Sequence, residues 1–148
     1  MTIAIGSDHR GYRLKETFKT HLSKLGHRLS DFGCSSEDSV DYPDFALQVA
    51  RAVSRRSAGL GILICSSGVG MSITANKVRG VRAALCFNEL MAARSRQHND
   101  ANVLCLGADY IARSKALRIL DAWLKAEFES GRHRRRLGKI RKQEQEWC

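Results

Sequence analysis

The sequence predicts an α/β protein with a single three-layer α/β/α domain. Short runs of Ile, Leu, Val and Ala recur along the chain, separated by stretches of about 10 to 17 residues with helical spacing of apolar side chains. The central apolar run shows no alternation of apolar and polar residues, which is typical of a strand covered on both faces of a parallel sheet. At 148 residues, the chain has the length of one domain.

Strand and helix patterns alternate, which predicts a Rossmann-like five-stranded parallel sheet with right-handed crossovers. Gly6 follows the first strand, Gly26 ends the first helix, and Pro43 begins the second helix. The expected strands are residues 2–5, 27–32, 60–64, 80–86 and 102–106, and the expected helices are residues 12–25, 43–53, 71–78, 88–97 and 112–128.

Composition limits the class of protein. Hydrophobic residues make up 43% and charged residues 27%, as in an ordinary globular protein. Because no apolar run reaches the length of a membrane span, we expect no membrane association. The N-terminus lacks the pattern of a signal peptide, and the five cysteines form no Cys-x-x-Cys pair. We therefore expect free thiols and a cytoplasmic location.

Positive charge is concentrated at the C-terminus. The chain carries a net charge of +10, and residues 131–148 hold seven Lys and Arg against two Glu. We expect residues 1–130 to form the domain and residues 131–148 to form a basic C-terminal arm, either a solvated helix or an arm laid on another surface. Such charge favours an anionic partner. Nucleic acid is disfavoured, because aromatic residues do not interleave the basic ones and no helix-turn-helix pattern is present.

The central apolar run leads into a loop of small residues. Cys65 follows the strand 60–64, and Ser66-Ser67-Gly68-Val69-Gly70 leads into a helix. This arrangement places backbone N–H groups and a helix N-terminus beside a thiol, which favours a reactive thiolate. The pattern completes neither a dinucleotide-binding fingerprint nor a Walker A loop. The alternative is that Cys65 is a small buried apolar residue.

Polar residues follow several predicted strands. Asp8 and His9 follow the first strand, and residues 96–100, with His98, end the helix before the fifth strand. We expect these groups to gather with Cys65 at the carboxyl edge of the sheet, where they would suit proton transfer at a carbon next to a carbonyl. As alternatives, Asp8 and His9 could cap a helix, and so could His98. The spacing of His, Asp and Cys does not indicate a zinc site.

Five segments together resemble the ribose-5-phosphate isomerase B family, which includes galactose- and allose-phosphate isomerases. The segments are residues 5–12, 39–44, 61–77, 95–103 and 131–133. The resemblance implies a metal-free aldose–ketose isomerase without a cofactor that interconverts ribose 5-phosphate and ribulose 5-phosphate. It assigns Cys65 as the base and Ser67 as a hydroxyl bonded to the thiol. It also implies that the reaction passes through an enediolate, which is held by backbone N–H groups of Ser66, Ser67, Gly68, Val69 and Gly70.

The same resemblance implies an active site built from two subunits of a homodimer or a dimer of dimers. His98 would come from the subunit opposite Cys65 and open the sugar ring with the help of Asp8 and Tyr42. The phosphate ligands would be His9, Arg132 and Arg136, with Asn99 near the sugar hydroxyls. The basic arm would then cross to the partner subunit.

Two departures from the family pattern bear on the substrate. The usual Cys-Gly-Thr-Gly is Cys65-Ser66-Ser67-Gly68 here, and Asp109 stands where the family often has an arginine that contacts phosphate. Arg113, Arg134 and Arg135 are the nearest replacements in sequence. Otherwise the substrate would be another sugar phosphate (allose 6-phosphate, galactose 6-phosphate or a tetrose phosphate), or the chain would be a non-catalytic sugar-phosphate binder.

Overall fold

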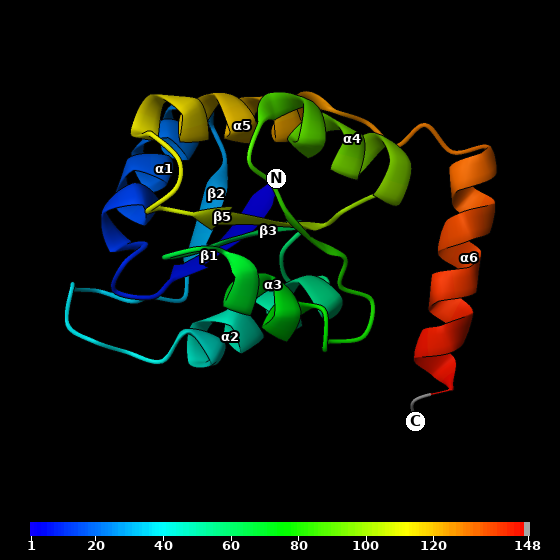
Figure 1. Cartoon of the computed structure of the whole chain (residues 1–148), viewed down its shortest axis with the longest axis horizontal. Helices are drawn as coiled ribbons and strands as arrows, with labels where there is room; N and C mark the ends of the chain where they lie inside the picture. The colour runs from blue at the N-terminus through cyan, green and yellow to red at the C-terminus, as the bar shows by residue number, and fades with distance from the viewer. Residues whose placement is uncertain (147–148) are drawn as a thin grey trace.

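The computed structural model describes residues 1–146 and contains one parallel sheet (Figure 1). Its strands lie in the order β2-β1-β3-β5-β4, which confirms the predicted Rossmann-like parallel sheet. The strands are β1 (Thr2–Ser7), β2 (Arg28–Asp31), β3 (Leu60–Cys65), β4 (Ala83–Leu85) and β5 (Val103–Gly107). All pairings are parallel, and Cys65 at the end of β3 lies opposite Gly107 at the end of β5.

Helices cover both faces of the sheet, as the α/β/α prediction requires. Helices α1, α4 and α5 lie on one face and α2 and α3 on the other, while α6 stands beside the sheet (Figure 1). The helices are α1 (Tyr12–Lys24), α2 (Tyr42–Ser54), α3 (Val69–Ala75), α4 (Glu89–Asn99), α5 (Arg113–Lys125) and α6 (Arg132–Gln145).

The core has two layers, one on each face of the sheet. Ile62 and Ile64 pack with Phe18 and Trp123 on the face covered by α1 and α5. Leu63, between them on β3, points to the other face, into the cluster under α2 and α3. Because β3 is buried along its whole length, both of its faces need apolar side chains, and this explains why the run shows no alternation. Each large side chain buried in this way contributes roughly 1.5–3 kcal/mol.

Two predicted elements are shorter in the structure. The strand expected at 80–86 pairs only over Ala83–Leu85, because the chain turns at Gly80 (φ +78°) and the Arg82 N–H donates to the Asn102 side chain instead of a strand. The helix expected at 112–128 ends at Lys125, and the Glu129 N–H donates to the Gln97 carbonyl at 3.0 Å. That bond directs the chain along the end of α4 toward α6.

Most of the predicted basic arm forms a helix, α6 (Arg132–Gln145). His133 and Leu137 are buried on the side of α6 that faces the domain, while the arginines beside them are exposed. Trp147 and Cys148, at the end of the predicted arm, lie outside the described residues. Within residues 1–146, no helix is long and apolar enough to cross a membrane.

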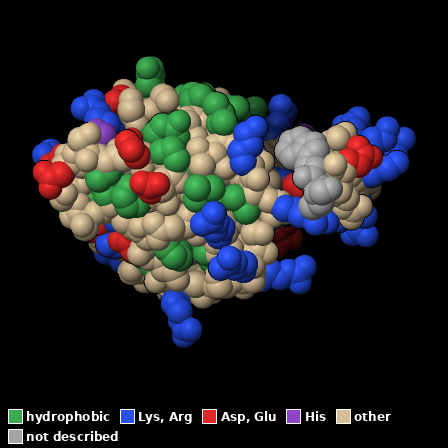
Figure 2. All heavy atoms as spheres, turned by 90° about the horizontal axis from the view of Figure 1, so that it is seen from below, with side chains coloured by type: hydrophobic (Ala, Val, Ile, Leu, Met, Phe, Trp, Pro, Cys, Tyr) green, Lys and Arg blue, Asp and Glu red, His purple; other side chains and the backbone are tan. Residues whose placement is uncertain are grey.

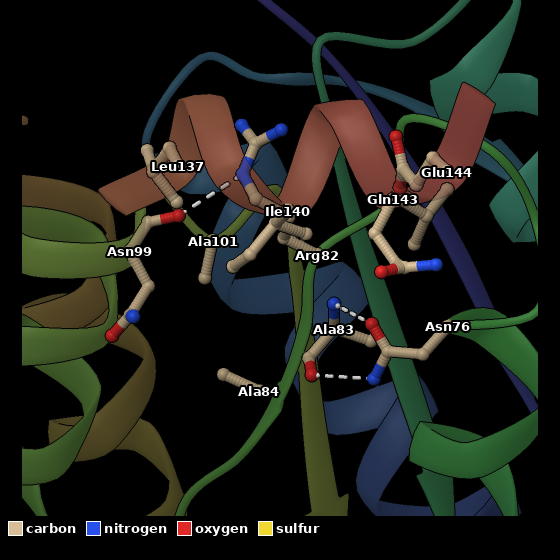
Figure 3. Close-up of a pocket in the computed structure, with 11 residues that line it drawn as sticks. Asn76, Arg82, Ala83, Ala84, Asn99, Ala101, Leu137, Ile140, Gln143 and Glu144 are labelled. Atoms are coloured by element: carbon tan, nitrogen blue, oxygen red, sulfur yellow. Dashed lines mark hydrogen bonds between the residues drawn. The ribbon is translucent and has the colours of Figure 1, made fainter. Parts of the chain in front are cut away.

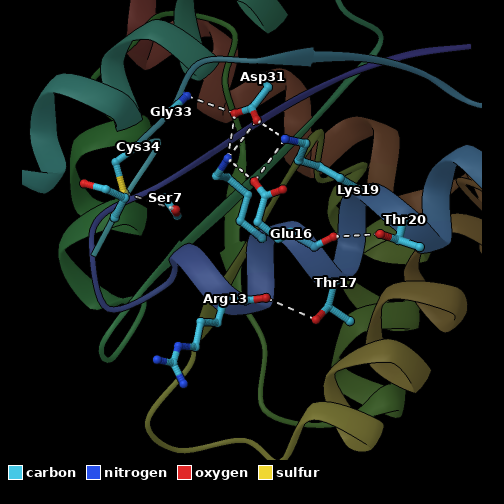
Figure 4. A network of polar contacts seen from close by, with 11 residues as sticks. Ser7, Arg13, Glu16, Thr17, Lys19, Thr20, Asp31, Gly33 and Cys34 are labelled. Carbon is cyan, nitrogen blue, oxygen red and sulfur yellow. Dashed lines mark hydrogen bonds and ion pairs between the residues drawn. The ribbon is translucent and has the colours of Figure 1, made fainter. Parts of the chain in front are cut away.

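A network of charged side chains joins α1 to β2 and to the loop that follows it (Figure 4). The Lys15 ammonium is 1% exposed and lies 2.7 Å from Asp31, which also pairs with Lys19. Although burial raises the pKa of Asp31, hydrogen bonds from Lys15 and Lys19 hold it below its usual value. Asp31 also accepts a hydrogen bond from the Gly33 N–H at 2.9 Å. The network therefore fixes the start of the loop that runs toward His9 and Tyr42.

Candidate active site

Cys65 lies at the carboxyl end of β3 and is 5% exposed. Its sulfur accepts a hydrogen bond from the Gly68 N–H at 3.1 Å. Its carbonyl accepts one from the Ala108 N–H at 2.8 Å, which ties the residue to the end of β5. These bonds fix the orientation of the sulfur at the edge where open parallel sheets bind ligands.

The loop after Cys65 depends on glycine. Gly68 has φ +78°, and a Cβ there would lie 2.9 Å from the Leu106 carbonyl carbon. This conformation turns the Gly68 N–H back to the Cys65 sulfur and starts α3 at Val69. The Val69 N–H donates to the Ser67 hydroxyl at 3.3 Å. Among the described hydrogen bonds, the sulfur is bonded to Gly68 and not to Ser67, so the thiol–Ser67 bond that the resemblance implies is absent here.

Asp8 and His9 reach the same edge from β1. The Asp8 N–H donates to the Ile64 carbonyl at 3.1 Å, which places the Asp8–His9 turn beside Cys65. The buried Asp8 carboxylate accepts hydrogen bonds from the Arg10 and Gly11 N–H groups at 2.9 and 3.0 Å, just before α1. One carboxylate oxygen, Oδ1, therefore holds the turn before α1. The predicted alternative that Asp8 caps the helix is wrong, because the N-cap residue of α1 is Gly11 and makes no side-chain cap hydrogen bond. His9 Nδ1 accepts a bond from the Val40 N–H at 3.2 Å.

Tyr42, the first residue of α2, brings a phenol to the loop. Its ring lies so close to Gly70 that a Cβ on Gly70 would be 2.5 Å from the ring carbon Cζ. The ring is 39% exposed. Tyr42, Asp8, His9 and the loop Ser66–Gly70 are thus brought together around Cys65 within one chain.

His98 and Asn99 lie at the opposite edge of the sheet, and the expectation that they gather with Cys65 in one chain is wrong. Both residues are at the end of α4, which runs antiparallel to the strands. Three residues later, the Asn102 carbonyl accepts a bond from the Gly61 N–H at the start of β3. The four residues from Gly61 to Cys65 span about 13 Å of strand. The alternation of strand and helix already implied this placement.

The His98 ring is stacked on the His133 ring of α6. Their centroids are 4.3 Å apart and the rings are parallel within 5°. The Glu129 carboxylate lies 3.7 Å from His98 Nε2 and 3.9 Å from His133 Nε2. Burial, followed by the charges of His98, Arg132 and Arg136, lowers the pKa of His133. No sequence spacing indicates this pair, because the two histidines are separated by a strand and a helix.

The same three side chains are a possible ligand set for a cation. The donor atoms of His98, Glu129 and His133 all lie within 4.8 Å of one another. The nitrogen lone pairs lie in the ring planes, and the two stacked planes do not meet near the rings, so an ion bound in line with both lone pairs would require one ring to turn. The stacked arrangement instead suits a proton-transfer group held by a neighbouring ring and carboxylate.

Arg132 and Arg136 lie one turn apart on α6 and are exposed. Lys and Arg side chains surround this helix in the lobe at the right of Figure 2. Because Arg132 is next to His133, whose ring is stacked on His98, the guanidinium groups of Arg132 and Arg136 lie near the same edge of the sheet as His98. The predicted site residues thus form two clusters, one around Cys65 and one around His98.

A groove of about 370 Å³ separates α6 from the edge strand β4 (Figure 3). Leu137 and Ile140 of α6 face Ala83, Ala84 and Ala101 across it. Asn76 bonds both the N–H and the carbonyl of Ala83 at 2.9 Å, so its amide occupies part of the open strand edge.

Several large apolar side chains of three helices are exposed: Leu90 and Met91 of α4, Ile73 and Val69 of α3, and Ile140 of α6, which also lines the groove. Where exposed apolar side chains gather, they are typical of an interaction site.

Comparisons with known proteins identify the family. Residues 3–140 match the family model described as Ribose/Galactose Isomerase. Ribose-5-phosphate isomerase B of Escherichia coli is 46% identical over 138 residues, covering 93% of each chain.

Solved structures give the same result. The ribose-5-phosphate isomerase B of Clostridium thermocellum has a TM-score of 0.99 and 52% identity over 100% of both chains. That of Mycoplasma genitalium, determined with bound ribulose-5-phosphate, has a TM-score of 0.95 and 47% identity over 98% of this chain and 97% of that one. The resemblance seen in the sequence is confirmed, and this chain belongs to the ribose/galactose isomerase family.

Proposed function

We propose that the protein interconverts ribose 5-phosphate and ribulose 5-phosphate, with Cys65 as the base. The observation that carries the proposal is the likeness to the Mycoplasma genitalium enzyme, a structure determined with bound ribulose-5-phosphate. The supporting geometry is a fixed sulfur at the carboxyl edge, surrounded by Asp8, His9 and Tyr42 and bonded by the Gly68 N–H.

The proposed reaction moves one proton between two carbons. In the open-chain aldose, the Cys65 thiolate removes the C2 proton, the electron pair forms a C1–C2 double bond, and negative charge passes to the C1 oxygen. The proton of the C2 hydroxyl then moves to the C1 oxygen. The sulfur finally returns its proton to C1, which leaves a carbonyl at C2 and regenerates the thiolate.

The loop Ser66–Gly70 would stabilise the intermediate. Its backbone N–H groups are held by the turn at Gly68, so they would require little reorganisation as charge develops on the enediolate oxygen. Since hydrogen-bond donors supply this stabilisation, no step of the proposed reaction requires a metal ion or a cofactor.

The second cluster would act in the active site of a partner subunit. Cys65 and His98 lie at opposite edges of one sheet, so His98 could open the sugar ring at Cys65 only across an interface between two copies. The apolar groove beside β4 and the exposed apolar residues of α3 and α4 offer a surface for such an interface. Helix α6 would then bring Arg132 and Arg136 to the phosphate of the substrate bound by the partner, with Asn99 near its hydroxyls.

A coupled assay of ribose 5-phosphate conversion tests the proposal, with allose 6-phosphate and galactose 6-phosphate in parallel. We expect activity on the pentose phosphate that is lost on thiol alkylation and unchanged by EDTA. Turnover of a hexose phosphate alone would overturn the substrate assignment. Inhibition by EDTA would overturn the metal-free reaction. Absence of turnover with all three sugars would favour a sugar-phosphate binder.

A further inference from the structure

Asp109 and Ser66, the two departures from the family pattern, lie together in the structure with Arg10. The Asp109 carboxylate accepts hydrogen bonds from Arg10 Nη2 at 2.9 Å and Nε at 3.2 Å, both on Oδ2. Its N–H donates to the Ser66 carbonyl at 3.1 Å. Arg10 was absent from the candidates that sequence proximity suggested, because 99 residues separate it from Asp109.

This Arg10–Asp109–Ser66 cluster is attached to the Cys65 loop on both sides. Ala108, next to Asp109, bonds the Cys65 carbonyl at 2.8 Å. Arg10 follows His9 in the turn whose Asp8 N–H is bonded to Ile64. The cluster therefore lies at the rim of the Cys65 edge, beside the groups around the sulfur.

A lone carboxylate at position 109 would repel a phosphate dianion. In this cluster, the charge of Asp109 is paired with that of Arg10. Hydrogen bonds from the Ser66 and Arg10 side chains lower the pKa of Asp109, so the carboxylate is ionised at neutral pH. Its charge is balanced by the guanidinium that it binds through Nε and Nη2. Three of the five guanidinium N–H donors lie outside those two bonds. The Arg10 side chain is 57% exposed, so these donors are accessible to a ligand.

We propose that Arg10 binds the phosphate group of the substrate and that Asp109 is its positioning residue, anchored on the Cys65 loop through Ser66. The inference rests on the proposed function and adds a cation that belongs to the same subunit as Cys65. Arginine suits this role because its planar fork can bind a carboxylate on one edge and a phosphate on another. The family often has an arginine at position 109. Here Arg10, held by Asp109 from the turn after β1, would take its place.

Steady-state kinetics of the full-length protein with ribose 5-phosphate test the proposal. For Arg10→Ala, we expect a KM about tenfold higher and a kcat within about twofold of the original value, because the contact is to a group remote from the reacting carbons. Arg13→Ala is the matched control. Arg13 is an exposed arginine three residues further along that pairs with Glu37, and its loss should leave KM unchanged.

Three further variants test whether Asp109 positions Arg10 or only neutralises its charge. Asp109→Asn should raise KM, because the guanidinium loses its anchor; a fall in KM would mean that Asp109 only repels the substrate, and would overturn the positioning role. Arg10→Asp should weaken binding more than Arg10→Ala. Adding Asp109→Arg to Arg10→Asp restores the ion pair with reversed charges and should recover most of the affinity. No recovery would overturn the proposed pairing.

Calorimetric titration with inorganic phosphate distinguishes failure of this inference from failure of the proposed function, since it requires no turnover. Weaker phosphate binding by Arg10→Ala supports the phosphate site even if the protein does not convert ribose 5-phosphate. Equal phosphate binding and equal KM in Arg10→Ala and the original protein would overturn the inference while leaving the isomerase intact.

Discussion

The two edges of the sheet carry different sets of polar side chains. At the carboxyl edge, Cys65 is surrounded by the loop Ser66–Gly70 and the Asp8–His9 turn, all held by backbone hydrogen bonds. At the amino edge, His98 is held by the ring of His133 and by Glu129, and the neighbouring α6 is rich in arginine. In the proposed reaction, the groups of the first edge would move a proton at carbon, while those of the second would protonate oxygen and bind the phosphate.

Neither edge alone has all the groups that the proposed reaction requires. The Cys65 edge lies close to acidic side chains, with Arg10 engaged by Asp109, whereas the described partners of His98 are the His133 ring and the Glu129 carboxylate. Since about 13 Å of strand lies between them, they would meet by pairing of two copies and not by a small movement of one chain. The predictions below separate the contributions of the two edges.

The largest expected effect is at the Cys65 edge. Cys65→Ala should reduce kcat about 10³-fold, the range of a positioned acid–base group, while leaving phosphate affinity nearly unchanged. Exchange of the C2 hydrogen with solvent, followed by NMR, measures the step directly. Cys86→Ala is the control, because burial raises the pKa of Cys86 to about 11 and keeps it a thiol. Retained exchange in Cys65→Ala would remove Cys65 as the base.

A smaller effect is expected at the other edge. Arg136→Ala should raise KM for ribose 5-phosphate about tenfold and lower kcat much less, because an anchoring contact to phosphate is made in both ground state and transition state. Arg135→Ala, which removes the adjacent exposed arginine of α6, should have little effect. If competitive inhibition by inorganic phosphate is the same in both variants, α6 does not contribute to the site.

The smallest expected effect is a pH dependence of folding stability, which arises from His133 on the buried side of α6. The folded protein holds the pKa of His133 below its usual value of about 6.5, so the folded state favours the neutral ring. The unfolded chain binds more protons as pH falls below about 6.5, and folding stability should decrease there. We expect the thermal midpoint to fall between pH 7.5 and 5.5. The fall should be smaller in His133→Phe, and identical slopes in the two proteins would contradict this assignment.

Much of the Cys65 edge could be predicted from the sequence because its determinants are local. An apolar run, a cysteine and a glycine-containing turn specify the strand, the thiol and the N–H groups within residues 60–70. The β4 boundary was less predictable, since it depends on a bond between Arg82 and the distant Asn102.

Pairings between distant residues set the remaining features. The His98–His133 stack, the Arg10–Asp109 pair and the contact of His21 with Asp121 at 2.7 Å join residues with no recognisable spacing. The half-buried His21 ring is bonded across α1 and α5. Such contacts follow from packing of the completed fold, which sequence periodicity does not encode.

Subunit complementation tests the central claim that the two edges form one site across an interface. Cys65→Ala and His98→Ala are produced separately and co-expressed, and each sample is assayed with ribose 5-phosphate at matched dimer concentration. Each variant alone should be nearly inactive. With random pairing, about half of the dimers are mixed, and one of the two sites in each mixed dimer combines an intact Cys65 with an intact His98. About a quarter of the original active sites should therefore be restored. Mixed protein as inactive as its parents would contradict the claim and place both residues in the site of a single chain.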